Sequence, residues 1–484
     1  MKPGPNRVMP TPGRRVVCVL AAWLAIVGPV CLAGDVPTPP PPADVKPAPV
    51  EAPTTAPAVA ESASTKPATK PAATEPAASG EDAPIFGMPP YHTEHFSIYC
   101  DKSQEMINDF AVRLEAMHAE YSTLMAKYLR PNNKRFKVFL FSDSQRFVAA
   151  GGHPLMPGIS MRTGRWPGSR LMLMVHSDRV EVPVDHLMRH EVWHHFNSTN
   201  VTGRFPTWLE EGFAEYIGYG IWTGDGVIYG TIRPEAYHSI KGYADAGRII
   251  PLRKLMPTSG GQWLGTAGTD EGWRGYMQSW SLVEFLTTAE EGKYRPRLQA
   301  YMDDLCSGRR PTASAAAIRE MDPQYQKWVK AITPTLTHEK FYEAVVAILT
   351  SHLARAHARG QRFKSAEAFL AAARGRTLDL APIGDDQWLP PSLMVECFWY
   401  IRQIRSSYGD MKLTLTYRDD RPTLRLKGDY VDLELTGAFR LKDGKVAAIN
   451  VKHLKPVPFD LNAGKKRRLR RDATTKPARR RRAK

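Results

Sequence analysis

Two stretches decide the fold, residues 185–200, DHLMRHEVWHHFNSTN, and residues 206–216, PTWLEEGFAEY. In the first, His190 and His194 are four positions apart, a spacing that places two side chains on one face of an α-helix, with Cβ atoms about 5–6 Å apart. Two imidazoles in this arrangement can bind one metal ion, and tetrahedral zinc suits nitrogen ligands at about 2.0–2.1 Å. We therefore predict a metal-binding helix that begins at Asp185 and ends near residue 199.

Glu191 completes the motif HExxH, because it lies directly between the two histidine positions in sequence. A carboxylate at this point can act as the general base that takes a proton from the attacking water. His186 extends the histidine face by one turn, but the motif does not need it as a ligand. His195 points about 100° away from that face and is expected to be a polar neighbour. The alternative is a pair of surface histidines on an amphipathic helix.

A catalytic zinc ion needs a third protein ligand and one open position. HExxH followed by WLxEGxAEY resembles the gluzincin peptidases, and most closely the peptidase-MA-like exported bacterial families. The resemblance covers roughly residues 90–335. It implies that Glu211 is the third ligand and that Glu215 supports a ligating histidine. Sixteen residues separate His194 from Glu211, slightly fewer than in the best-known members.

The spacing of the acidic residues agrees with this assignment. Glu211 and Glu215 are four positions apart, so one helix face presents both carboxylates, and a carboxylate behind a ligating imidazole orients it. Thr207 and Glu210 have the spacing of a capping box, which gives Glu210 a structural role at the start of the helix. We therefore expect Glu211, and not Glu210, to face the metal. The alternative is an acidic helix face in contact with solvent.

Tyr276 opens the stretch YMQSWSLVEF, which is similar to a stretch after the zinc helices of peptidase-MA-like proteins. A phenol near the metal could donate a hydrogen bond to the oxyanion of a tetrahedral intermediate. The alternative is a core tyrosine stacked on Trp280, one helical turn further on. His238 is a weaker candidate for the oxyanion role.

Hydrophobic periodicity predicts a mixed α+β protein. The period-two pattern of 411–454, with a Lys442-Asp443-Gly444 turn, indicates a small antiparallel sheet, and a Gly-Asp-Gly turn indicates a hairpin between 221 and 229. Other strands are expected at 95–100, 136–141 and 171–175. Helices are expected at 103–128, 142–150, from after Thr207 to about 218, at 276–288, 294–305 and, Ala-rich, 341–373.

Composition divides the chain into six expected segments. Pro and Ala fill half of residues 35–84, so this stretch cannot bury enough apolar surface to fold. The segments are a signal peptide (1–34), a disordered Pro/Ala-rich linker (35–84), a zincin-like metallopeptidase domain of mixed sheet plus active-site helices (85–335), a helical region (336–408), a small antiparallel β module (409–460) and a basic disordered tail (461–484).

The N-terminus predicts export to the periplasm, the cell envelope or the medium. Arg14 and Arg15 precede an apolar stretch, residues 16–30, which has the length of a signal peptide and is short for a membrane span. The alternative is retention as an uncleaved membrane anchor. The three cysteines after this segment match no zinc-ribbon or redox spacing, so the fold is expected to depend on its hydrophobic core.

The net charge of +17 is concentrated at the ends of the chain. Residues 465–484 contain twelve Lys and Arg against one Asp, and the first 34 residues add four more cations. In an exported protein, such a tail fits an anionic polymer of the cell envelope better than DNA, so no specific nucleic acid is expected. The alternative is a solubilising tail without a specific partner.

Together these features predict an exported peptidase with one zinc ion, which hydrolyses peptide bonds of protein or peptide substrates with Glu191 as general base. Two other functions stay open. One is a non-catalytic envelope-binding protein with a structural zinc on a zincin scaffold, and the other is a zinc hydrolase of a non-peptide amide.

Overall fold

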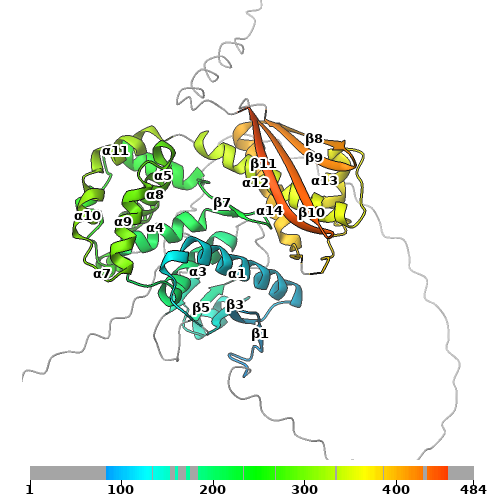
Figure 1. The fold of residues 1–484 in the computed structure, drawn as a ribbon. Helices are drawn as coiled ribbons and strands as arrows, with labels where there is room; N and C mark the ends of the chain where they lie inside the picture. The colour runs from blue at the N-terminus through cyan, green and yellow to red at the C-terminus, as the bar shows by residue number, and fades with distance from the viewer. Residues whose placement is uncertain are drawn as a thin grey trace, which may run out of the picture.

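The computed structural model describes residues 83–455 except for 133, 153–157, 162–169, 175–183, 233, 267–268, 333–334, 385 and 429–432. The predicted signal peptide and basic tail lie outside the described residues, as does nearly all of the Pro/Ala-rich linker. Helices and sheets are both present, as an α+β protein requires (Figure 1). Within the described ranges, none of the helices combines the length and apolar character needed to cross a membrane.

The first sheet has five strands in the order β1-β2-β3-β5-β4. The three central strands pair in parallel, and the two outer strands pair antiparallel to their neighbours. The central strands confirm the three predicted from apolar runs, whereas the short outer strands escaped prediction. The strands are β1 (Pro90–His92), β2 (Phe96–Cys100), β3 (Phe136–Phe141), β4 (Gly158–Met161) and β5 (Arg170–Met174).

Three helices accompany this sheet. Helix α1 (Gln104–Leu124) begins after Ser103, whose hydroxyl accepts a hydrogen bond from the backbone N–H of Met106. Asp143 caps the short helix α2 (Ser144–Ala149) in the same way. Helix α3 (Val184–Asn200) contains the HExxH motif and contacts α1, β4 and β5. These side-chain caps satisfy N–H groups that would otherwise lack a partner at the helix starts.

Helices α4 to α11 form the second layer, drawn in green in Figure 1. Helix α4 packs on α8 so closely that a Cβ at Gly212 would lie 2.6 Å from the carbonyl oxygen of Ser279. Helix α8 is longer than the predicted helix 276–288. The helices are α4 (Thr207–Gly218), α5 (Pro234–Asp245), α6 (Leu252–Leu255), α7 (Gly260–Gly265), α8 (Asp270–Gly292), α9 (Arg295–Cys306), α10 (Thr312–Arg319) and α11 (Asp322–Ala331).

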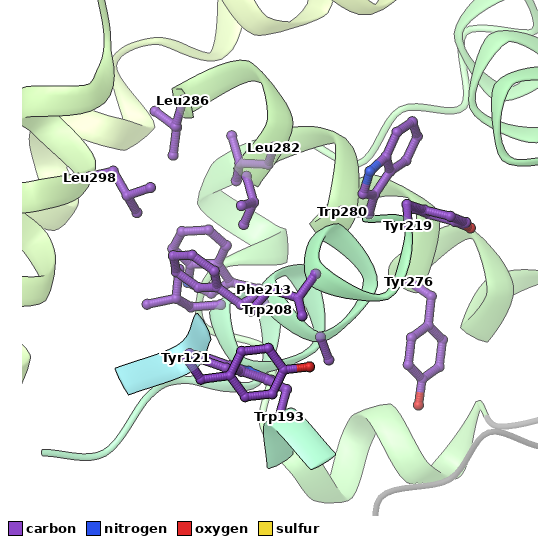
Figure 2. Packing of buried hydrophobic residues seen from close by; sticks show 14 of the residues in the cluster. Tyr121, Trp193, Trp208, Phe213, Tyr219, Tyr276, Trp280, Leu282, Leu286 and Leu298 are labelled. Atoms are coloured by element: carbon purple, nitrogen blue, oxygen red, sulfur yellow. The ribbon is translucent and has the colours of Figure 1, made fainter. Parts of the chain in front are cut away.

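Aromatic and aliphatic side chains join these layers (Figure 2). The ring of Phe213 on α4 lies 5.5 Å from that of Trp193 on α3, and Trp208 on α4 lies 5.8 Å from Tyr301 on α9. Figure 2 shows Phe213 and Trp208 between Trp193 and the leucines of α8. Because these side chains are buried and contact both neighbouring helices, they fix the position of α4 relative to α3.

The C-terminal part contains three helices and a four-stranded antiparallel sheet in the order β11-β10-β9-β8. The sheet confirms the period-two prediction. The predicted helical stretch 341–373 is two helices, because Gly360 adopts a left-handed conformation and Ser365 caps a new helix. The elements are α12 (Thr335–Ala358), α13 (Ala366–Arg374), α14 (Pro391–Tyr408), β8 (Met411–Arg418), β9 (Arg421–Gly428), β10 (Glu434–Lys442) and β11 (Lys445–Lys455).

The predicted hairpin connects the two parts of the molecule. Its strands, β6 (Ile221–Trp222) and β7 (Val227–Ile228), follow α4 directly and pack into the hydrophobic core of the C-terminal part. Asp225 at its turn receives two hydrogen bonds of 2.9 and 3.0 Å from Arg355 on α12. Figure 1 shows β7 between the green helices and the yellow helices α12 and α14. Helix α4, which carries the predicted ligand Glu211, is therefore tied to the C-terminal core.

Candidate metal centre

Helix α3 is held by buried polar contacts on the side that faces α1. Tyr121 donates a 2.9 Å hydrogen bond to the backbone carbonyl of Arg189. At the start of α3, Asp185 lies 3.3 Å from the guanidinium of Arg113, which is itself buried. Because an unpaired buried charge is strongly unfavourable, these contacts fix the axial position of the helix that carries the histidines.

Three ligand atoms from α3 and α4 converge on one point. The Nε2 atoms of His190 and His194 are 3.0 Å apart, and Oε2 of Glu211 lies 3.6 Å from the first and 3.4 Å from the second. All three side chains are buried. This group could hold a metal ion. These three residues are the metal ligands predicted from the sequence, and the structure brings them together.

The triangle has the size that a small tetrahedral ion requires. Two atoms that are each about 2.0–2.1 Å from such an ion are roughly 3.4 Å apart. The distances of 3.4 and 3.6 Å from Glu211 to the imidazoles are long for hydrogen bonds. Among the residues that the structure describes, Oε2 of Glu211 has no hydrogen-bond partner although it is buried. A cation between the three atoms would satisfy that oxygen, so the residues present fit a bound metal ion.

Glu215 lies behind the first histidine. Its Oε1 is 3.3 Å from Nδ1 of His190, and its Oε2 is 3.2 Å from Nε2 of His186. A Cβ at Gly218 would lie 2.7 Å from the His186 ring, so a larger residue there would displace it. His186 is therefore no member of the ligand triangle but a partner of the carboxylate that orients His190.

The structure gives Glu210 a different role from the predicted one. Helix α4 begins after Pro206 and has no side-chain cap, so the predicted capping box with Thr207 does not form. Glu210 instead accepts at Oε1 from Nδ1 of His194, at 3.0 Å, and its other oxygen accepts from the amide of Asn197. The local spacing favoured a cap, but a contact between two helices takes the carboxylate. Each of the two histidines in the triangle thus has its own carboxylate beside Nδ1.

Ion pairing outweighs burial throughout this cluster. Burial opposes the charge on His190, but Glu211 and Glu215 raise the pKa of His190 to about 9. Burial would raise the pKa of Glu211, but His194 and His190 lower it to about 2. Against burial, His186 and His190 also hold the pKa of Glu215 well below its usual range. The carboxylates are therefore ionised at neutral pH, and the site favours a cation.

Glu191, the predicted general base, is fully buried on α3 directly after His190. His195, the predicted polar neighbour, is also buried, and its ring meets the ring of Phe136 in the first sheet at 4.4 Å. His195 therefore faces the sheet, on a different side of α3 from the ligand triangle. The structure thus places His195 on a different face of α3 from His190 and His194.

Tyr276 lies in the core on α8, and its ring meets the ring of Trp263 edge-on at 5.3 Å. Trp280, its predicted stacking partner, packs against Tyr219 instead, at 5.5 Å (Figure 2). His238, the weaker oxyanion candidate, is exposed on α5. Neither residue is part of the ligand triangle.

His186, Glu210 and Asn197 also support the site, a role that was not predicted from the sequence. The pattern HxxxHxxxH, in which His186, His190 and His194 repeat at one-turn spacing, is the signal that could have pointed to His186. No known protein family, curated protein or solved structure matches the chain.

Proposed function

We propose that this protein is an exported zinc-dependent peptidase of the gluzincin type, with a zincin-like domain formed by the first sheet and helices α3 and α4. The observation that carries the proposal is the ligand triangle of 3.0, 3.4 and 3.6 Å, in which a separate carboxylate contacts Nδ1 of each histidine. Two nitrogen ligands and one carboxylate oxygen are a donor set that suits catalytic zinc.

Different side chains would bind the metal, transfer the proton and orient the histidines. His190, His194 and Glu211 would hold zinc, which supplies Lewis acidity that polarises a carbonyl group and lowers the pKa of water. Glu191 takes a proton from the attacking water and returns it to the leaving amine. Glu215 and Glu210 keep the imidazoles in the orientation that directs Nε2 at the metal.

The first experiment measures zinc content and hydrolysis of a peptide library by the full-length protein and its Glu191→Gln variant. Zinc content should stay at one ion per chain, because the substituted residue is no ligand. Hydrolysis should fall by roughly 10²–10⁴-fold, the usual contribution of a general base. Glu320→Gln, an exposed carboxylate on another helix end, serves as the matched control and should change neither quantity.

The same experiment separates the other two functions. Zinc without hydrolysis of any peptide by the wild-type protein would favour a non-catalytic binding protein. Hydrolysis of a non-peptide amide but of no peptide would favour the third function. A Glu191→Gln variant that keeps most of its activity would contradict the proposed mechanism itself.

A further inference from the structure

A cavity of about 410 Å³ opens in the C-terminal part, between α12, α13, α14 and the segment that connects α13 to α14. Its volume is in the range of small-molecule sites, which is about 300–1,000 Å³. Its walls are mostly apolar and include Leu378, Leu389, Met394, Trp388 and Phe398. No residue of the metal centre lines it. The cavity is therefore a separate feature of the fold.

Among the described residues that line the cavity, one has a buried polar atom without a partner. His352 on α12 lines the cavity and is 1% exposed. Its Nδ1 donates a 2.8 Å hydrogen bond to the carbonyl of Ile348, so its Nε2 carries the free lone pair. Within the described part of the chain, this Nε2 has no hydrogen-bond partner. Because a buried acceptor without a partner is unfavourable, the ring is suited to a ligand that donates a hydrogen bond.

The charged residues of the lining are both cations. Arg374 and Arg376 are exposed and line the cavity, and the described lining includes no Asp or Glu. The guanidinium of Arg374 lies 4.9 Å from the centre of the Phe398 ring, which holds it over the wall of the cavity. Two cations beside an apolar cavity with no acidic residue attract an anionic ligand group.

Arg355 holds in place the part of the cavity wall that is formed by Trp388 and Leu389. Arg355, one turn after His352 on α12, donates hydrogen bonds of 3.0 Å to the carbonyl of Gln387 and 3.1 Å to Asp386. These residues directly precede Trp388 and Leu389, which line the cavity. A ligand would therefore find this part of the wall in place and would not have to order it on binding.

From these features we propose that the cavity binds an aromatic carboxylate whose ring carries a hydrogen-bond donor. The carboxylate contacts Arg374 and Arg376 at the opening, the ring packs on the apolar walls, and a phenol or indole donor reaches His352. A free aromatic acid and a C-terminal tyrosine or tryptophan of a peptide share this chemistry. This site is independent of the metal centre.

The proposal is tested by isothermal titration calorimetry on the full-length protein. The probes are 4-hydroxyphenylpropionate, phenylpropionate without the donor, the amide of the first acid without the charge, and N-acetyltyrosine as the mimic of a peptide end. We expect one molecule of 4-hydroxyphenylpropionate to bind per chain. Loss of the donor or of the charge should weaken binding roughly tenfold, in line with the loss of one hydrogen bond to a buried or charged group.

Variants of the lining residues test whether the probes bind in this cavity. Arg376→Gln and Arg374→Gln should each weaken the acids and leave the amide unchanged, whereas Arg418→Gln, an exposed arginine on β8, should have no effect. Val395→Trp, at an exposed wall position, should abolish binding because it fills the opening. His352→Leu should remove the preference for the phenol, and if that variant fails to fold, the comparison of the two acids on wild-type protein still decides this point.

Tighter binding of N-acetyltyrosine would identify a peptide end as the source, and tighter binding of the simple acid would identify a free metabolite-like acid. The proposal is overturned if no probe binds at millimolar concentrations, if both acids bind equally well, or if Arg418→Gln weakens binding as much as Arg376→Gln does.

Discussion

Two helices of this molecule bury histidines, and their different partners give the side chains opposite properties. On α3, Nδ1 of His190 faces the carboxylate of Glu215, and together with Glu211 this outweighs burial and raises the pKa of His190 to about 9. On α12, Nδ1 of His352 donates to a backbone carbonyl, and burial with Arg355 nearby lowers the pKa of His352 to about 4. The environment of His190 stabilises positive charge, whereas the environment of His352 keeps its ring neutral, so that Nε2 can accept a hydrogen bond.

The lesson is that the burial of a histidine does not by itself decide its chemistry. The sequence around both residues is helical and apolar, so local pattern treats them alike. The partner of Nδ1 makes the difference, and on α3 this partner comes from another helix. Changes confined to one of the two regions should therefore leave the properties of the other unchanged.

The largest expected effect comes from Gly212→Ala. The added Cβ would lie 2.6 Å from the backbone oxygen of Ser279 on α8, which no side-chain rotation can relieve. Helix α4 must move, so we expect a loss of more than about 3 kcal/mol in the free energy of unfolding, at the upper end of overpacking effects, together with weaker metal binding. Denaturant unfolding and metal titration measure both quantities.

Gly437→Ala is the matched change in the C-terminal part. There the Cβ would meet the side-chain oxygen of Thr350 and a methyl group of Val346, both on α12. The double variant with Thr350→Ala should therefore regain part of the lost stability, and metal binding should not change. Equal metal loss in both glycine variants would contradict the separation of the two regions.

A smaller effect is expected from the titration of His352. Its pKa is lowered from 6.5 to about 4, so the neutral form is favoured in the folded state. Its contribution to stability is fully present above pH 6.5 and is lost as the pH falls from there towards 4. Between pH 7.5 and 4.5, the wild-type protein should therefore lose about 2–3 kcal/mol more stability than His352→Leu. Chemical denaturation at both pH values measures this difference, and parallel pH profiles would show that the buried ring does not titrate as described.

The smallest effect is expected from removal of the supporting carboxylates, and it concerns the free energy of zinc binding. Glu215→Ala and Glu210→Ala each remove the partner of one ligating Nδ1, so zinc affinity should fall roughly 10–100-fold without loss of the site. Asn197→Ala, which removes only a neighbour of Glu210, should reduce affinity less. Competition with a chromophoric chelator gives the three affinities. If Glu210→Ala lowers stability but leaves zinc affinity at the wild-type value, its role is structural, as the capping spacing suggested.

Local sequence patterns predict most helices and strands near the site, but not the contacts between them. Helices α3 and α4 follow from apolar periodicity, and the strands β2, β3 and β5 from apolar runs, because these signals are local. The role of Glu210 could not be predicted, since His194 lies sixteen positions earlier and meets it only when the two helices pack. The capping-box spacing, which is a local rule, predicted instead that Glu210 pairs with Thr207.

The contacts of the hairpin and the cavity beside His352 were not predicted either, because both depend on long-range packing. The hairpin at 221–229 was predicted, but its insertion into the C-terminal core, where Arg355 holds Asp225, depends on residues more than a hundred positions apart. The cavity beside His352 is formed by α12, α13, α14 and a connecting segment without regular pattern. Periodicity identifies the elements, whereas such contacts arise only from their tertiary arrangement.

The most direct test of the metal centre is the zinc content of purified Glu211→Ala at a fixed free zinc concentration, measured by plasma mass spectrometry. Glu320→Ala is the control. The proposed site predicts one zinc ion per chain in the wild-type protein and the control, and nearly none in Glu211→Ala, because two buried imidazoles lose the carboxylate that completes the triangle. Full zinc content in Glu211→Ala would contradict the assignment of His190, His194 and Glu211 as the metal ligands.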